Sequence, residues 1–148
     1  MKKTILYLTC FVVLVIILLT ISIAQSQKEI DNWIKDTKDG DIFVRVRAVG
    51  ALAYVTTAPA IQALVRSMQE DEEFYVREKA AKSLMIIGIP CVEQVIPVLK
   101  NPNMEIRSLA VWVLKDCTDQ KFGTDIKKWE NWLKSYKKKV ELQAKKKK

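Results

Sequence analysis

The sequence lacks histidine altogether, and its 148 residues include only four glycines, four prolines and three cysteines. The side chain most often used as a general base near neutral pH is therefore missing. No Gly-x-Ser-x-Gly turn, glycine-rich phosphate loop or Cys-x-x-Cys pair is present. The acidic run Asp71–Glu73 does not have the spacing of a calcium loop, and helix capping explains it. We therefore expect no catalytic residue, no metal site and no cofactor.

Positive charge is concentrated at the carboxyl end. The formal net charge is +8, and Lys134–Lys148 alone holds eight lysines against one glutamate. The rest of the chain is close to neutral, so nucleic acid is not an expected partner of that part. The basic tail is assigned to residues 137–148. The whole segment Lys134–Lys148 has three interpretations: a disordered solvated tail, a contact for anionic lipid head groups, or a site for another polyanion such as nucleic acid.

The first 24 residues differ from the rest. Lys2 and Lys3 precede an apolar run, Ile5–Ala24, which is the order found in export signals. Small residues at Ser22 and Ala24 would suit cleavage after Ala24. The run is also about 20 residues long, enough to span a bilayer. Residues 1–24 are thus a signal peptide or an amino-terminal membrane anchor. The protein would be exported to the periplasm or anchored to the cytoplasmic membrane.

One pattern, Val/Ile-Arg-x-x-Ala-x-x-x-Leu, occurs three times, in Val44–Leu52, Val76–Leu84 and Ile106–Leu114. The copies are offset by 32 and then 30 residues. This period, with helical spacing inside each copy, is typical of an α-solenoid. We predict an all-α superhelix of about three helical hairpins over residues 39–136, with capping helices at its ends. The amino-terminal cap is expected at residues 25–38.

Helix boundaries can be predicted from caps and breakers. The first helix of each hairpin is expected over Asp41–Tyr54, Glu73–Ile87 and Asn103–Lys115. Acidic or amide side chains suited to capping precede these helices: Asp39, Asp41, Asp71, Glu73, Asn101 and Asn103. The second helices are expected from Ala58, over Val92–Lys100 and over Asp125–Tyr136 or beyond. Pro97 should shift the start of the middle one or kink it.

The segments Asp-x-Asp/Glu-x-x-Val-Arg-x-x-Ala-x-x-x-Leu resemble HEAT repeats, in particular the short bacterial type found in bilin-lyase-like proteins. The likeness covers Asp39–Tyr136, and the third copy has asparagine at both acidic positions. It implies a structural role for Arg45, Arg77 and Arg107, each paired with a repeat acid such as Asp41, Asp71 or Glu73. A basic row for an anionic ligand is the alternative.

A second resemblance concerns the chain's last repeat. Thr118–Asp125, followed by Trp129 and Trp132, is similar to the end segment of exported bacterial HEAT proteins, where Thr-Gly-Gln-x-Phe-Gly-x-Asp precedes Trp-x-x-Trp. Asp119 stands where glycine is usual, which leaves the conformation of this turn open. Both resemblances are specific for fold and say little about activity.

In this architecture the second helices usually line the concave face, so their polar positions are the predicted partner-binding residues. These are Gln62, Arg66, Gln69, Glu93, Gln94, Lys127, Lys128, Asn131 and Lys134. The predicted function is a non-catalytic protein-binding scaffold at the bacterial cell envelope. One alternative is an accessory subunit or lyase-like enzyme of the HEAT family. Another is a membrane-surface tether that uses Lys134–Lys148.

Trp112 and two cysteines remain to be placed. Trp112 occupies an outward position where the other repeats carry Gly50 and Lys82, and we expect the extended ending of the chain to cover it. If exposed, it would be a contact residue. Cys91 and Cys117 fall in neighbouring repeats. Buried free thiols are the expected state, and a disulfide is the alternative.

Overall fold

The computed structural model describes residues 15–16 and 26–146, and all regular structure in those residues is helical. The elements are a helix over residues 26–36, then α2 (Ile42–Ala51), α3 (Ala58–Glu70), α4 (Phe74–Ile87), α5 (Val92–Val95), α6 (Met104–Thr118) and α7 (Ile126–Lys146). Short 3₁₀ turns cover Leu52–Tyr54, Ile89–Cys91 and Ile96–Lys100. The predicted all-α class is confirmed.

Two helix starts follow from side-chain caps. The carboxylate of Asp41 accepts a hydrogen bond from the Phe43 N–H at 2.8 Å. Helix α2 begins at Ile42, directly after Asp41. The amide oxygen of Asn103 accepts from the Glu105 N–H at 2.9 Å, at the start of α6. Each bond satisfies a backbone donor that has no partner inside its helix.

The start of α4 differs from the expectation. Glu73 is its N-terminal flanking residue, but the Glu73 side chain makes no capping hydrogen bond. Asp71 accepts instead from the Glu73 N–H at 3.0 Å. In the other two repeats, Asp39 accepts a hydrogen bond from the Asp41 N–H and Asn101 accepts one from the Asn103 N–H. The prediction of a Glu73 cap was therefore wrong. The contact that all three turns share is made by the residue two positions earlier: Asp39, Asp71 or Asn101.

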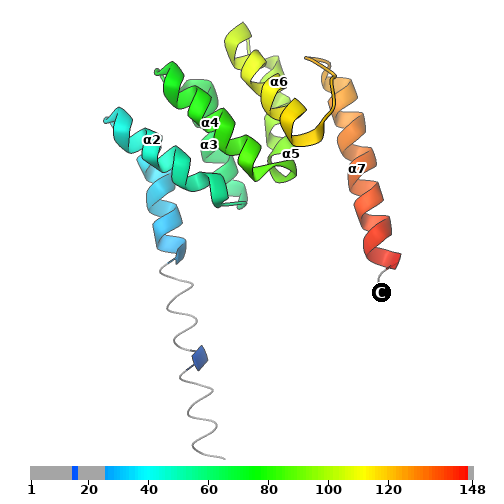
Figure 1. Ribbon diagram of the computed structural model, residues 1–148, viewed down its shortest axis with the longest axis horizontal. Helices are drawn as coiled ribbons and strands as arrows, with labels where there is room; N and C mark the ends of the chain where they lie inside the picture. The colour runs from blue at the N-terminus through cyan, green and yellow to red at the C-terminus, as the bar shows by residue number, and fades with distance from the viewer. Residues whose placement is uncertain (1–14, 17–25, 147–148) are drawn as a thin grey trace, which may run out of the picture.

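The helices form two stacked layers (Figure 1). Helices α2, α4 and α6 lie side by side in one layer, and α3 and α5 lie beneath them in the other. The repeated alanines Ala48, Ala80 and Ala110 are all buried. Small side chains at these positions let neighbouring helices approach closely. One hydrophobic core runs from Val49 through the repeats to Trp129, as a solenoid with a shared seam requires.

Pro97 divides the second helix of the middle repeat. The α-helical part is only Val92–Val95, and Ile96–Lys100 continues as a 3₁₀ turn with Pro97 near its start. Proline has no N–H for the helical ladder and crowds the preceding turn. The chain turns by 117° between α4 and the segment Ile89–Lys100. Many side chains of both segments are buried in the core.

Both ends of the stack are covered by helices. Ile30, Trp33 and Ile34 of the first helix pack against the core, as expected of an amino-terminal cap. At the other end Trp129 of α7 is fully buried. Helix α7 continues to Lys146, so the described part of the basic tail is helical rather than disordered. Figure 1 shows the first helix and α7 extending from the stack toward the same side.

The predicted leader, residues 1–24, lies outside the described residues apart from positions 15 and 16. Within the part of the chain that the structure describes, no single helix is both long and apolar enough to cross a membrane. The bent pair of α4 and Ile89–Lys100 reaches that length and composition only when its two segments are taken together.

Candidate functional site

A polar hollow lies between α3 and α5, on the face formed by the second helices. It has a volume of about 400 Å³ and is lined by Gln62, Val65, Arg66, Gln69, Glu70 and Gln94. The first five of these residues belong to α3. They recur every three or four positions, so they lie on one side of that helix. Gln94 comes from α5. We call this cavity the α3–α5 hollow.

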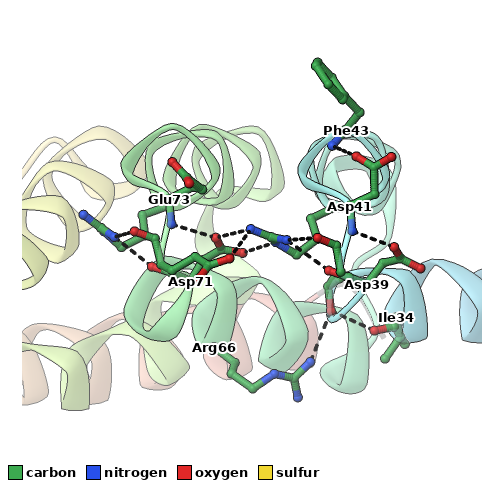
Figure 2. Close-up of polar contacts among 12 residues, drawn as sticks. Ile34, Asp39, Asp41, Phe43, Arg66, Asp71 and Glu73 are labelled. Carbon is green, nitrogen blue, oxygen red and sulfur yellow. Dashed lines mark hydrogen bonds and ion pairs between the residues drawn. The ribbon is translucent and has the colours of Figure 1, made fainter.

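Arg66 holds a fixed place in the α3–α5 hollow. Its Nη2 donates to the hydroxyl of Thr37 at 3.2 Å, and that hydroxyl donates to the Ile34 carbonyl at 2.8 Å. Figure 2 shows this chain of bonds running from Arg66 to Ile34. Thr37 is buried. Arg66 therefore ties α3 to the amino-terminal cap while it lines the hollow, which orders its side chain before any partner binds.

A second cavity, the α5–α7 hollow, lies between the middle repeat and α7. It has a volume of about 520 Å³. Its apolar lining is Ile96, Pro97 and Leu133, and charged side chains surround this lining: Glu93, Glu130, Lys134, Lys137, Lys138 and Glu141. Lys137 and Glu93 form an ion pair of 2.8 Å across it. An apolar floor with a polar rim is the usual composition of a protein-binding surface.

The structure brings together some of the predicted partner-binding residues. Gln62, Arg66, Gln69 and Gln94 share the α3–α5 hollow, and Glu93 and Lys134 share the α5–α7 hollow.

Three of the predicted residues, Lys127, Lys128 and Asn131, are exposed and line neither hollow. Helix α7 turns its Trp129 side toward the repeats, which leaves these residues on its other sides. Lys128 pairs instead with Asp125 at 3.3 Å.

The three repeated arginines make one shared contact. In each, Nη1 donates to the backbone carbonyls of the residues six and five positions earlier. The acceptors are Asp39 at 3.0 Å and Gly40 at 3.3 Å, Asp71 at 2.7 Å and Glu72 at 2.9 Å, and Asn101 and Pro102 both at 2.8 Å. Each arginine therefore fixes the turn that enters its own first helix.

The carboxylate partners of the arginines differ. Arg45 binds Asp71 of the next repeat through Nε at 2.9 Å and Nη2 at 3.1 Å, and both side chains are buried. The hydrogen bond to Asp71 raises the pKa of Arg45. Figure 2 shows Asp71 in this network, while Asp41 caps α2 beside Phe43. Arg45 therefore pairs with Asp71, not with Asp41 of its own repeat.

Asp71 is one of the expected partner acids, but the other two arginines do not bind the carboxylate of any of the acids named for them. Arg77 binds Glu105 at 2.7 Å rather than Glu73. Among the described residues Arg107 bonds only to carbonyl oxygens, and no following repeat places a carboxylate beside it. The arginine row is thus built into the turns between repeats, and for Arg45 and Arg77 the bound carboxylate leaves little charge for a free anion.

Sequence reasoning missed a row of exposed apolar side chains at the starts of α2, α4 and α6. Phe43 is 81 % exposed and Met104 is 72 % exposed, and Phe74 and Tyr75 are also exposed. Each lies one or two positions before the repeated Val or Ile, so comparison of the three copies could have found the row.

Trp112 is 40 % exposed, so the expectation that the chain's ending would cover it was wrong. The ending instead folds onto α7. Phe122 packs edge-on against Trp129 with ring centroids 4.9 Å apart, and the Trp129 Nε1–H donates to the Gly123 carbonyl at 2.9 Å. Trp112 remains on the outer surface of α6 as an exposed apolar residue.

Asp119, at the position where glycine is usual, adopts a left-handed conformation with φ 57° and ψ 21° directly after α6. Glycine takes this conformation without steric cost, and aspartate tolerates it better than most residues. The turn that glycine would form is therefore kept. It directs residues 120–125 back toward Trp129.

The stacked hairpins, the buried alanine seam and the arginine-held turns define an α-solenoid. The sequence model of a family described as HEAT repeats matches residues 30–115. That match covers more than half of the chain, and the protein belongs to the HEAT-repeat family. HEAT repeats generally mediate protein interactions. No curated protein matches the chain.

Proposed function

We propose that this protein is a non-catalytic scaffold that binds a protein partner across the α3–α5 and α5–α7 hollows. The observation that carries the proposal is their position: both open on the face of the second helices, and α5 contributes to each. A polar cavity beside an apolar one provides hydrogen bonding and burial within a single contact. Membership of a family that generally mediates protein interactions supports this function.

The lining residues favour a partner of a particular chemistry. Gln62, Gln69 and Gln94 offer amide groups that both donate and accept hydrogen bonds, which suits the backbone or polar side chains of a peptide segment. Ile96 and Leu133 offer an apolar floor for one aliphatic or aromatic side chain. The expected ligand is a protein segment that has polar groups next to an apolar anchor.

Matched substitutions test this surface. Gln62→Arg places a longer charged side chain in the α3–α5 hollow, and Ser108→Arg places the same side chain at an exposed position on α6. Both variants and the parent are used to capture proteins from an extract of the source organism, with quantification by mass spectrometry. A partner retained by Ser108→Arg and lost by Gln62→Arg supports the proposal. Equal recovery by both variants contradicts it.

A location at the bacterial cell envelope belongs to the same proposal. It rests on the order of Lys2, Lys3 and the apolar run Ile5–Ala24. Fractionation of cells that produce the full chain, with sequencing of its amino terminus, tests this part. A chain that starts at Gln25 in the periplasm indicates a signal peptide, and an uncleaved chain in the membrane indicates an anchor. Recovery in the cytoplasm contradicts both.

A second function, contact with an anionic membrane surface, is favoured by the course of α7. The helix carries its lysines out to Lys146 and extends to the same side of the stack as the first helix (Figure 1). In the sequence, the apolar run ends just before that first helix. Lys138, Lys139, Lys145 and Lys146 are all exposed. Each lysine near an anionic surface contributes about 1 kcal/mol.

Charge neutralisation tests the membrane function on the fragment from Gln25 onward, which removes the apolar run. Replacing Lys138, Lys139, Lys145 and Lys146 by glutamine should weaken binding to phosphatidylserine vesicles by up to about a thousand-fold. The matched control replaces four exposed or half-buried lysines of the repeats by glutamine: Lys79, Lys82, Lys100 and Lys115. Equal weakening in both variants, or binding that is insensitive to salt, contradicts the proposal.

A further inference from the structure

Two free thiols meet where the second and third repeats join. Cys91 ends the 3₁₀ turn after α4 and is fully buried, and Cys117 lies in the last turn of α6 and is half-buried. Their sulfur atoms are 3.8 Å apart, although the residues are 26 positions apart in sequence. Both sulfur atoms lie near the same carbonyl oxygen, that of Leu84, at 3.4 Å from Cys91 Sγ and 3.8 Å from Cys117 Sγ.

We propose that Cys91 and Cys117 form a redox modification site that a small disulfide, such as oxidised glutathione, converts to an intramolecular disulfide. A disulfide bond requires its sulfurs to be about 2.05 Å apart, and the two thiols already lie within van der Waals contact. The shared Leu84 carbonyl holds both on the same side of the α4 terminus. The proposal is independent of the partner-binding function.

The surroundings of the two thiols set the order of the reaction. Cys117 is the more accessible of the pair, and the hydrogen bond from Cys91 lowers the Cys117 pKa. The same interaction and burial raise the Cys91 pKa. The thiolate is the reactive form of cysteine. Cys117 therefore attacks first, and Cys91 resolves the intermediate.

The two steps balance as thiol–disulfide exchange. The Cys117 thiolate attacks one sulfur of oxidised glutathione, which breaks the glutathione disulfide and releases one glutathione thiolate. Cys91 then loses its proton to that thiolate or to water, and its sulfur attacks the Cys117 sulfur. The second glutathione leaves as a thiolate. In sum, the cysteine pair loses two protons and two electrons, and one glutathione disulfide becomes two glutathione thiols.

The bond would join the turn after α4 to the end of α6. Helix α5 follows Cys91 directly and lines both hollows through Gln94 and Glu93. A covalent link at Cys91 would therefore anchor the start of α5 against the third repeat. Oxidation should reduce hydrogen exchange in Val92–Lys100 and leave exchange in α3 unchanged.

The test uses the full-length chain with Cys10→Ser, so that only the pair can react. After incubation with oxidised glutathione, a tryptic digest is mapped by mass spectrometry. The expected product is a Cys91–Cys117 cross-linked peptide that disappears on reduction. The same chain unfolded in urea gives the oxidation rate without the fold. The inference is overturned if the folded chain keeps both thiols free or forms the bond no faster than the unfolded chain.

Two single variants test the order of the steps, each also carrying Cys10→Ser. With Cys91→Ala, oxidised glutathione should leave a stable glutathione adduct on Cys117. With Cys117→Ala, the buried Cys91 should react at least ten-fold more slowly. Circular dichroism establishes that each variant is folded, and the cross-link test above needs neither variant. An adduct that forms faster on Cys91 than on Cys117 overturns the assigned roles.

Discussion

Replacement of Arg45 by methionine tests the role of the buried ion pair. Methionine keeps much of the apolar stem of arginine and removes the guanidinium group. Asp71 would then lose its buried partner, and its side chain is only 5 % exposed. Arg77→Met is the matched control, because Arg77 makes the same two carbonyl bonds. Its partner Glu105 is 45 % exposed, so water can solvate the carboxylate that is left behind.

The burial of the two ion pairs determines how far the two variants should differ in free energy of unfolding. Removing one partner of a buried ion pair costs about 3–5 kcal/mol, whereas an exposed pair contributes about 0–1 kcal/mol. The loss of carbonyl bonds is common to both variants and cancels in the comparison. Arg45→Met should therefore be about 2–4 kcal/mol less stable than Arg77→Met. That difference is a large part of the 5–15 kcal/mol typical of a folded domain.

Urea unfolding of the fragment from Gln25 onward, followed by far-ultraviolet circular dichroism, measures the two free energies of unfolding. Adding Asp71→Asn to Arg45→Met should recover most of the loss, because asparagine removes the buried charge and keeps an oxygen for the Glu73 N–H. The reasoning is refuted if the two arginine variants lose equal stability, or if Asp71→Asn brings no recovery.

Four further predictions concern the buried and exposed tryptophans, Asp119 and the cysteine pair. Trp129→Ala should lower the free energy of unfolding by about 3–5 kcal/mol because Trp129 is fully buried, whereas Trp112→Ala should cost only about 1 kcal/mol; urea titrations compare them. Asp119→Gly should raise stability by about 0.5–1 kcal/mol by relieving a left-handed φ, and a lower melting temperature would contradict this. Oxidation of Cys91 and Cys117 should raise stability by about 3 kcal/mol, read as a higher urea midpoint than that of the reduced protein. Cys91→Ala should raise the Cys117 pKa. The rate at which iodoacetamide alkylates Cys117 should therefore rise at higher pH than in the parent. An unchanged dependence of this rate on pH would show that Cys91 does not lower the Cys117 pKa.

The repeats were predictable because three copies of one pattern report the same physical requirements. The buried alanines, the capping residues before each first helix and the break at Pro97 all follow from local chemistry. The polar residues of α3 could be assigned to one face from helical spacing alone, and four predicted residues share the α3–α5 hollow.

The features that sequence reasoning missed depend on contacts between repeats. Glu105 replaces Tyr75 at the equivalent position of the third copy, so no repetition marked it as the partner of Arg77. Helix α7 is oriented with Trp129 against the repeats, so Lys127 and Asn131 lie on its other sides and line neither hollow. Trp112 is exposed because the chain's ending folds onto α7. None of these outcomes follows from periodicity within a single helix.

Site-specific photo-crosslinking is the most direct test that the second-helix face binds the partner. A benzophenone amino acid is placed at Gln62 or Gln94 in the hollow and, for comparison, at Lys82 or Ser108 on the layer of first helices. Irradiation of cells of the source organism should yield one protein adduct from the two hollow positions and none from the other two. Adducts arising only from Lys82 or Ser108, or equally from all four positions, would contradict a partner seated on the α3 and α5 face.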